Sequence, residues 1–125
     1  MLLKNTGIDH AGYRIDRISE DIKRELISLM RELKDPRVSG KMLTVVNVKV
    51  SNDLSYAKVY VSAMEGLDAA KEACKGLDSA QGYLRRTLGN NLHLRKAPEL
   101  SFVADDSIKK GMEIFEKLKE TSNEN

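Results

Sequence analysis

The residues of this chain best suited to binding a charged ligand lie between Ser79 and Pro98. Every charged side chain in this stretch is basic, whereas the whole chain is nearly balanced, with 21 Lys and Arg against 19 Asp and Glu. The basic side chains are those of Arg85, Arg86, His93, Arg95 and Lys96. Phosphate backbones select a positive surface without acids, because binding releases condensed counterions. The stretch therefore predicts a nucleic-acid contact, and a merely solvated charged face is the alternative.

Helical spacing indicates how the basic stretch would be presented. Leu84, Leu88 and Leu92 recur at four-residue steps and would form one apolar stripe on a helix that runs to Pro98. The side of that helix away from the stripe would carry Arg85, Arg86, Asn90, His93 and Lys96. Gly82, near its start, would allow a sharp kink after a preceding helix.

No residue pattern in the chain predicts catalysis, a metal site or a cofactor. His10 and His93 have no nucleophile nearby in the sequence, and Cys74 with two histidines does not supply a set of metal ligands. The adjacent Asp105 and Asp106 are compatible with acid–base chemistry or magnesium binding, but their place before a helix favours capping. We therefore expect a protein that is not an enzyme, has no cofactor and binds no small-molecule substrate.

Size and composition predict one soluble, cytoplasmic domain. The chain has 125 residues, of which 41% are hydrophobic and 32% charged, and no apolar run reaches the roughly 18 residues that span a membrane. Its single cysteine, Cys74, excludes an internal disulfide and is expected to pack as a small buried hydrophobe. We expect a flexible lead-in at 1–12, one domain at 13–119, a disordered tail at 120–125, and a monomer.

Hydrophobic periodicity predicts the elements that position the basic stretch. The first helix should end near Lys34, because Asp35 precedes a proline and is pushed out of the helical region. The turn at 51–54 should join two strands as a hairpin. In chain order the predicted elements are a helix at 13–34, strands at 43–50 and 56–64, a helix at 67–77, the basic helix, a strand at 99–104 and a helix at 108–118.

Strict alternation also predicts which side chains of the hairpin face the core. Val46, Val48 and Val50 are expected on the inner face of the first strand. On the second strand the inner side chains are expected to be Ala57, Val59, Val61 and Ala63, and the outer ones Tyr56, Lys58, Tyr60 and Ser62. Outward tyrosines could stack on nucleic-acid bases, but cross-strand packing is the favoured interpretation.

Several segments resemble one family of small nucleic-acid-binding domains. The predicted order of elements is similar to that of a type II KH domain, an α+β fold with a three-stranded sheet backed by helices. A KH domain usually holds nucleic-acid backbone with a GxxG loop between two helices, and here Ala80-Gln81-Gly82 occupies that place. An Ala-x-Gly kink instead of GxxG resembles the bacterial ribosome-binding factor A family. Further segments that resemble this family in order are DPR at 35–37, SNDL at 51–54 before YAKVYV at 56–61, LRR at 84–86, LHLR at 92–95, PEL at 98–100 with Phe102, and Asp106-Ser107 with Gly111.

The resemblance covers about residues 14–118 and implies a function. It implies a non-enzymatic assembly factor that binds the free 30S small ribosomal subunit and supports late maturation of 16S rRNA, including processing at the 5′ end, with a link to growth in the cold. By resemblance the RNA contacts are Ala80, Gly82, Arg85, Arg86, Arg95 and Lys96, to which the polar side of the helix adds Asn90 and His93. The alternative is a protein interaction module whose basic helix docks an acidic partner.

Overall fold

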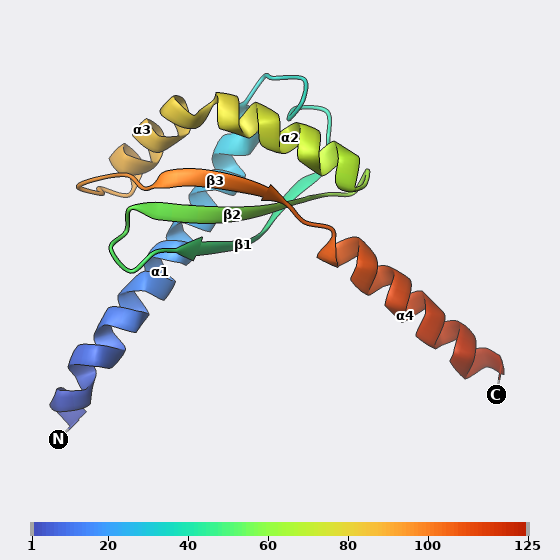
Figure 1. Cartoon of the computed structure of the whole chain (residues 1–125), viewed down its shortest axis with the longest axis horizontal. Coiled ribbons are helices and arrows are strands. Elements are labelled where there is room, and N and C mark those ends of the chain that lie inside the picture. The colour runs from blue at the N-terminus through green and yellow to red at the C-terminus, as the bar shows by residue number, and fades with distance from the viewer. Residues whose placement is uncertain (1, 125) are drawn as a thin grey trace.

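The computed structural model describes the backbone of residues 2–124 and the side chains of residues 14–107 and 109–120. Figure 1 shows the elements in chain order. They are α1 (Leu2–Glu32), β1 (Leu43–Val50), β2 (Tyr56–Ala63), α2 (Leu67–Ser79), α3 (Gln81–Asn91), β3 (Glu99–Ala104) and α4 (Ser107–Glu124). The fold is α+β, with the order of elements predicted from the sequence.

The sheet has the strand order β1-β2-β3 and is mixed. β1 and β2 form the predicted antiparallel hairpin, while β3 lies parallel to β2 and is the second edge of the sheet. The bounds of β1 and β3 are those predicted, and β2 ends one residue earlier than predicted, at Ala63. Because α2 and α3 intervene between β2 and β3, the chain has the length of connection that parallel pairing requires.

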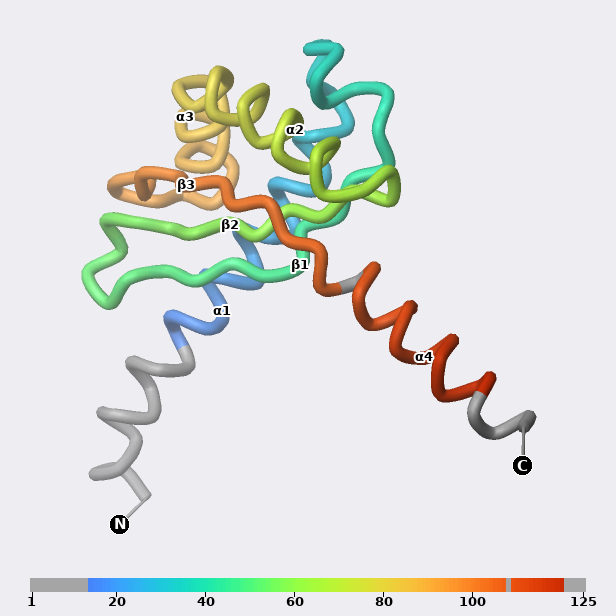
Figure 2. The backbone as a smooth tube through the Cα atoms, turned by 45° about the vertical axis from the view of Figure 1, so that its right-hand side comes forward, coloured from blue at the N-terminus to red at the C-terminus, as the bar shows by residue number. Residues whose placement is uncertain are grey.

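Three helices cover one face of this sheet and bury a single core. α1 contacts β1, α2 contacts β2 and β3, and α3 contacts α1 and β3 (Figure 2). The largest fully buried side chains come from the three helices, β1 and β2 and include Ile22, Leu26, Val45, Val59, Val61, Leu77, Leu84 and Leu88. The leucine stripe predicted for α3 is therefore the contact that holds the basic segment against the domain.

A bulge in β1 makes one part of the predicted alternation wrong. Val45 pairs with Val61 and Asn47 pairs with Tyr60, so that Val46 is an extra residue without a partner on β2. The buried side chains of β1 are Val45 and Val48, whereas Val46 and Val50 are only half-buried. Strict period-two alternation carries no signal for an inserted residue, and this is why it failed here.

One outward position of β2 also differs from the prediction. Ser62 is only 5% exposed, although it lies on the face away from the helices. It lines a hollow with Thr44, Met64 and Met112, at the end of the sheet where α4 begins. The first turns of α4 therefore shield this end of the outer face.

α3 is shorter than the predicted basic helix, which was expected to run to Pro98. The helix ends at Asn91, and His93 follows with a φ of 55°, in the left-handed region. The N–H of Leu94 donates to the carbonyl of Gly89 at 2.9 Å, the bond that closes a Schellman-type helix end. Glycine usually occupies this left-handed position, so the His93 in its place hid the helix end from sequence reasoning.

The predictions for the two ends of the chain can be compared with the structure only in part. α1 ends at Glu32, two residues before the predicted end, and its backbone is helical from Leu2 rather than from Tyr13. The predicted lead-in at 1–12 lies outside the residues whose side chains are described, as does nearly all of the predicted tail at 120–125; both stay predictions. Among the described residues, no helix is long and apolar enough to cross a membrane.

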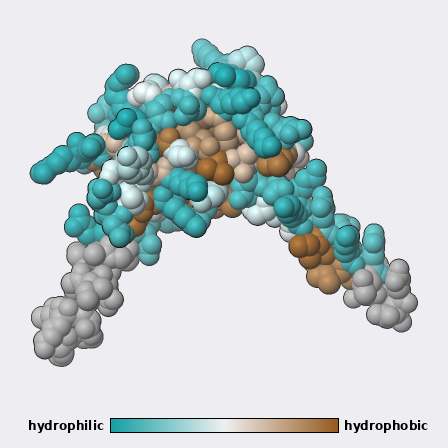
Figure 3. Space-filling view, in the orientation of Figure 1, coloured by the Kyte–Doolittle hydropathy of each residue, from teal (hydrophilic) through white to brown (hydrophobic). Residues whose placement is uncertain are grey.

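The described part of α4 extends away from the sheet, with an apolar side that the domain does not cover. Met112, Phe115 and Leu118 are each more than half exposed. Figure 3 shows an apolar strip on the leg at lower right, beside polar side chains. The core of the domain is therefore complete without this helix.

Candidate nucleic-acid interface

The kink between α2 and α3 is a junction of one residue. Ala80, with φ −93° and ψ 13°, both ends α2 and precedes α3. Its N–H donates to the carbonyl oxygens of Gly76 and Leu77, at 3.2 and 3.0 Å, and its own carbonyl accepts the N–H of Leu84 at 2.9 Å. Because both backbone groups of Ala80 are used within the two helices, the kink is a fixed bend and not a flexible loop.

Gln81, which sequence reasoning missed, fixes the kink against the sheet. Its side-chain oxygen accepts the N–H of Leu100 at 2.7 Å, and its side-chain nitrogen donates to the carbonyl of Leu100 at 2.8 Å and to Asp78 at 3.3 Å. The side-chain amide of Gln81 thus hydrogen-bonds both the N–H and the C=O of Leu100 on the edge strand β3, as the backbone of a further strand would. No local pattern could have predicted a contact between residues so far apart in the chain.

The two glycines near the kink have opposite surroundings. A Cβ built on Gly76 would lie 2.8 Å from Cγ2 of Val38 and 3.2 Å from Cβ of Arg37, because the loop 33–42 crosses α2 there. A Cβ built on Gly82 would meet no described heavy atom within 4 Å, and Gly82 is exposed. The fold therefore requires a glycine at position 76, and it leaves the surface at position 82 open to a ligand.

This contrast predicts different effects of the same substitution. Gly76→Ala should lower the free energy of unfolding by about 1–3 kcal/mol, because a packed loop must move to admit the methyl group. Gly82→Ala should not lower it, since alanine favours a helix over glycine by up to about 1 kcal/mol. Urea denaturation of both variants measures this difference. Equal midpoints would show that the loop adjusts freely over α2.

Arg85 differs from the exposed cation that the sequence predicted. Its Nη2 donates to the carbonyl of Ala97 at 3.0 Å, and its buried Nε has no hydrogen-bond partner among the described residues. Arg85 is half-buried and ties the loop after α3 back to the helix. This loop, residues 92–98, ends at the fully buried Pro98. The structure therefore gives Arg85 a positioning role, and its contact with RNA stays a prediction.

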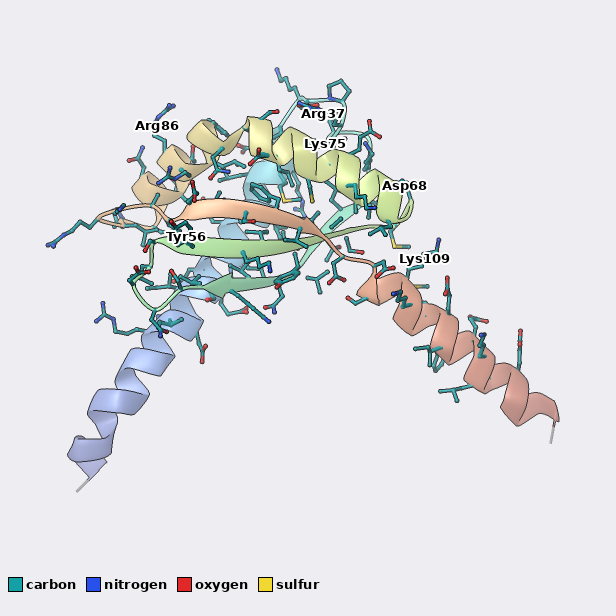
Figure 4. All side chains as sticks on the ribbon, viewed as in Figure 1. Arg37, Tyr56, Asp68, Lys75, Arg86 and Lys109 are labelled. Carbon is teal, nitrogen blue, oxygen red and sulfur yellow. The ribbon has the colours of Figure 1, made fainter. Side chains whose placement is uncertain are left out.

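The remaining predicted residues are exposed but do not share one helix face. Arg86 and Asn90 lie on α3, and Figure 4 shows Arg86 pointing outward from it. His93, Arg95 and Lys96 are exposed on the loop 92–98, because the helix ends before them. The predicted cationic side of one long helix is thus a helix and a loop held together by Arg85. We call Arg86, Arg95 and Lys96 the exposed basic set.

A neighbouring aromatic residue and several acids complete this surface. Tyr83, another residue that sequence reasoning missed, is 42% exposed one position after Gly82. Glu25 of α1 accepts a hydrogen bond from the side chain of Asn91, while Asp78 and Glu99 line a shallow groove between α2 and β3 together with Gln81. The acid-free stretch of sequence is therefore bordered in space by carboxylates, which limits the positive surface to the kink, α3 and the loop 92–98.

The acidic and thiol groups that could serve catalysis or metal binding have structural roles in the fold. Hydrogen bonds from the side chain and the N–H of Ser107 lower the pKa of the Asp105 carboxyl group. The N–H of Ser107 donates to Asp105 at 2.7 Å, which agrees with the predicted capping at the start of α4. Asp106 pairs with Lys110 at 3.5 Å. Burial raises the pKa of the Cys74 thiol to about 11, so the thiol stays protonated, as expected for a buried hydrophobe. Within the described residues, no three His, Cys, Asp or Glu side chains gather as a metal site would require.

The fold and its surface define the class of protein: an α+β domain of the KH-like type, whose kinked helix pair lacks GxxG and carries an exposed basic set. Within that class, the chain belongs to the ribosome-binding factor A family, because the family model described as ribosome-binding factor A matches residues 14–118. The predicted resemblance and the predicted fold class are both confirmed.

Individual relatives support the same assignment. The chain is 46% identical over 113 residues to the ribosome-binding factor A of Acetivibrio thermocellus, a match that covers 90% of this chain and 91% of the relative. It is similar to the crystal structure of ribosome-binding factor A from Thermus thermophilus, with 30% identity, a TM-score of 0.63 and coverage of 72% of this chain and 94% of the other. It is also similar to a homology model of the Thermus thermophilus factor fitted into a cryo-EM map of a 30S complex, with 31% identity, a TM-score of 0.57 and coverage of 69% and 89%.

Proposed function

We propose that this protein binds the free small ribosomal subunit through the kink, α3 and the loop 92–98. The single observation that carries the proposal is the exposed basic set beside a fixed kink, with open space at Gly82. Family membership and similarity to a factor fitted into a 30S complex support the subunit as the partner.

The geometry suits recognition of RNA by shape and phosphate position. Arg86, Arg95 and Lys96 are long cationic side chains that can neutralise phosphates, and none of them forms an ion pair within the described residues. Gly82 has no side chain to keep an RNA backbone away from the kink, and Tyr83 offers a ring on which a base can stack. Base-edge reading is not needed for such a contact.

The finer role that we propose is the one that the resemblance to the family implies. It is that of a non-enzymatic, monomeric and cytoplasmic assembly factor, which supports late 16S rRNA maturation, including processing at the 5′ end, and growth in the cold. An RNA-shape reader suits this role, because a maturing rRNA differs from the mature one in conformation more than in sequence. The described residues contain no gathered metal ligands, and none of the predicted contacts needs a cofactor.

Gradient sedimentation tests this function most directly. We expect the purified protein to migrate with free small subunits and not with large subunits or whole ribosomes. Added salt should release it steeply, since each phosphate contact with single-stranded RNA contributes about 0.7 to the salt exponent. Equal association with all three particles would contradict a subunit-specific role. Retention on an acidic protein after RNase treatment would favour the interaction module instead.

A further inference from the structure

The outer face of the sheet, opposite the helices, carries a second cationic cluster. Lys49 of β1 and Lys58 of β2 are direct partners in the strand register, and both are exposed. The Nζ atoms of both lysines lie 5.7 Å from the centroid of the Tyr60 ring. We call Lys49, Lys58 and Tyr60 the outer-face cluster. It shares no residue with the exposed basic set.

This arrangement is unfavourable for the isolated protein. Like charges directly opposite on neighbouring strands are destabilising, and one tyrosine ring offers only a partial compensation to two cations. Within the described residues neither lysine forms an ion pair with a carboxylate. The pair is therefore a local positive charge that no described carboxylate neutralises and that an anion from outside could bind.

Within the described residues, no carboxylate forms an ion pair with Lys49 or Lys58. Hydrogen bonds from the side chains of Ser55 and Ser51, and from the N–H of Ser55, lower the pKa of the Asp53 carboxyl group to about 2. Glu99 is the register partner of Tyr56, and Asp16 and Glu20 of α1 line a shallow hollow beside Lys49 but form no ion pair with any residue whose side chain is described. The positive charge between Lys49 and Lys58 therefore remains available to a ligand.

We propose that the outer-face cluster binds a second segment of single-stranded RNA, with a phosphate between Lys49 and Lys58 and a base on an outward tyrosine. Tyr56, 60% exposed, lies on the same face two residues before Lys58. A nucleotide supplies both an anion and a stacking ring, whereas an acidic side chain supplies only the anion. The inference rests on the proposed function only for the identity of the RNA, which would then contact the protein on two sides of its sheet.

Removing the two lysines separates this role from a structural one. Lys49→Gln with Lys58→Gln should lower the salt exponent for binding of a fluorescently labelled oligouridylate by about 0.7, since the one phosphate contact between the two lysines is lost. The same variant should unfold at an equal or higher temperature, because the repulsion between the lysines is gone. Lys34→Gln with Lys71→Gln is the matched control: it removes the same charge from exposed positions outside the outer-face cluster and the exposed basic set.

Several outcomes decide the proposal. Ultraviolet cross-linking of the oligouridylate to the peptide that contains Tyr56 and Tyr60 would support it, whereas equal salt exponents for the two double variants would overturn it. Competition by polyglutamate as strong as that by oligouridylate would overturn it in favour of an acidic protein segment. If the protein sediments with small subunits but the exponents are equal, only this inference fails. If it does not sediment but the exponents differ, only the proposed function fails.

Discussion

Replacing Arg86 and Lys96 with glutamate should abolish co-sedimentation with small ribosomal subunits without lowering the unfolding midpoint. Both side chains are exposed, and neither has a hydrogen bond or ion pair within the described residues, so the fold does not depend on them. Each substitution removes a phosphate contact and adds a charge that repels the backbone. The lost contacts alone should reduce the salt exponent for single-stranded RNA by about 1.4. Gradient sedimentation measures the loss of subunit binding, a salt titration of single-stranded RNA binding measures the exponent, and urea denaturation measures the midpoint.

A matched variant separates this local effect from the change in net charge. Lys34→Glu with Lys109→Glu reverses the same charge at exposed positions away from the kink, and it should keep most of the subunit binding. Arg85 is left unchanged in both variants, because its bond to Ala97 holds the loop 92–98 in place. If both double variants lose binding equally, only the total charge matters, and the kink surface has no particular role.

The strands and the kink could be predicted because their signals are local. Alternation in β3 and the composition of the 51–54 turn each depend on residues close in sequence, and the structure places these elements where they were expected. The Ala80-Gln81-Gly82 kink was found through its place between two helical patterns. The leucine stripe of Leu84 and Leu88 is buried as the four-residue spacing predicts.

Other features depend on contacts that a periodic pattern does not contain. The helix end before His93 depends on a left-handed residue that is not glycine, and it moves Arg95 and Lys96 from a helix to a loop. The bond of Gln81 to Leu100 and the bond of Arg85 to Ala97 form only when distant segments meet. These contacts decide which basic side chains of the stretch remain exposed to a ligand. The sequence therefore predicted which residues make up the candidate site, but not how they are arranged in space.

The fold also explains why the sequence indicates only one of the two cationic surfaces. Lys49 and Lys58 lie in separate strands, and each has uncharged neighbours, so neither forms a charge run. Only the register of the hairpin brings them opposite each other and over one ring. A cluster that forms only when two strands pair therefore cannot be predicted from the spacing of charges along the chain.

Leu88→Ala should lower the free energy of unfolding by about 2–5 kcal/mol, because it removes a fully buried side chain and leaves a cavity. Leu88 belongs to the core beneath α3, so the loss would also loosen the helix that presents Arg86. Leu118→Ala is the matched control, since it deletes the same atoms from a side chain that is 63% exposed on α4, and it should change stability by no more than about 0.5 kcal/mol. Urea denaturation with an unchanged m-value measures both. Equal midpoints for the two variants would mean that α3 is not anchored by its leucines, and that the kink surface has no rigid support.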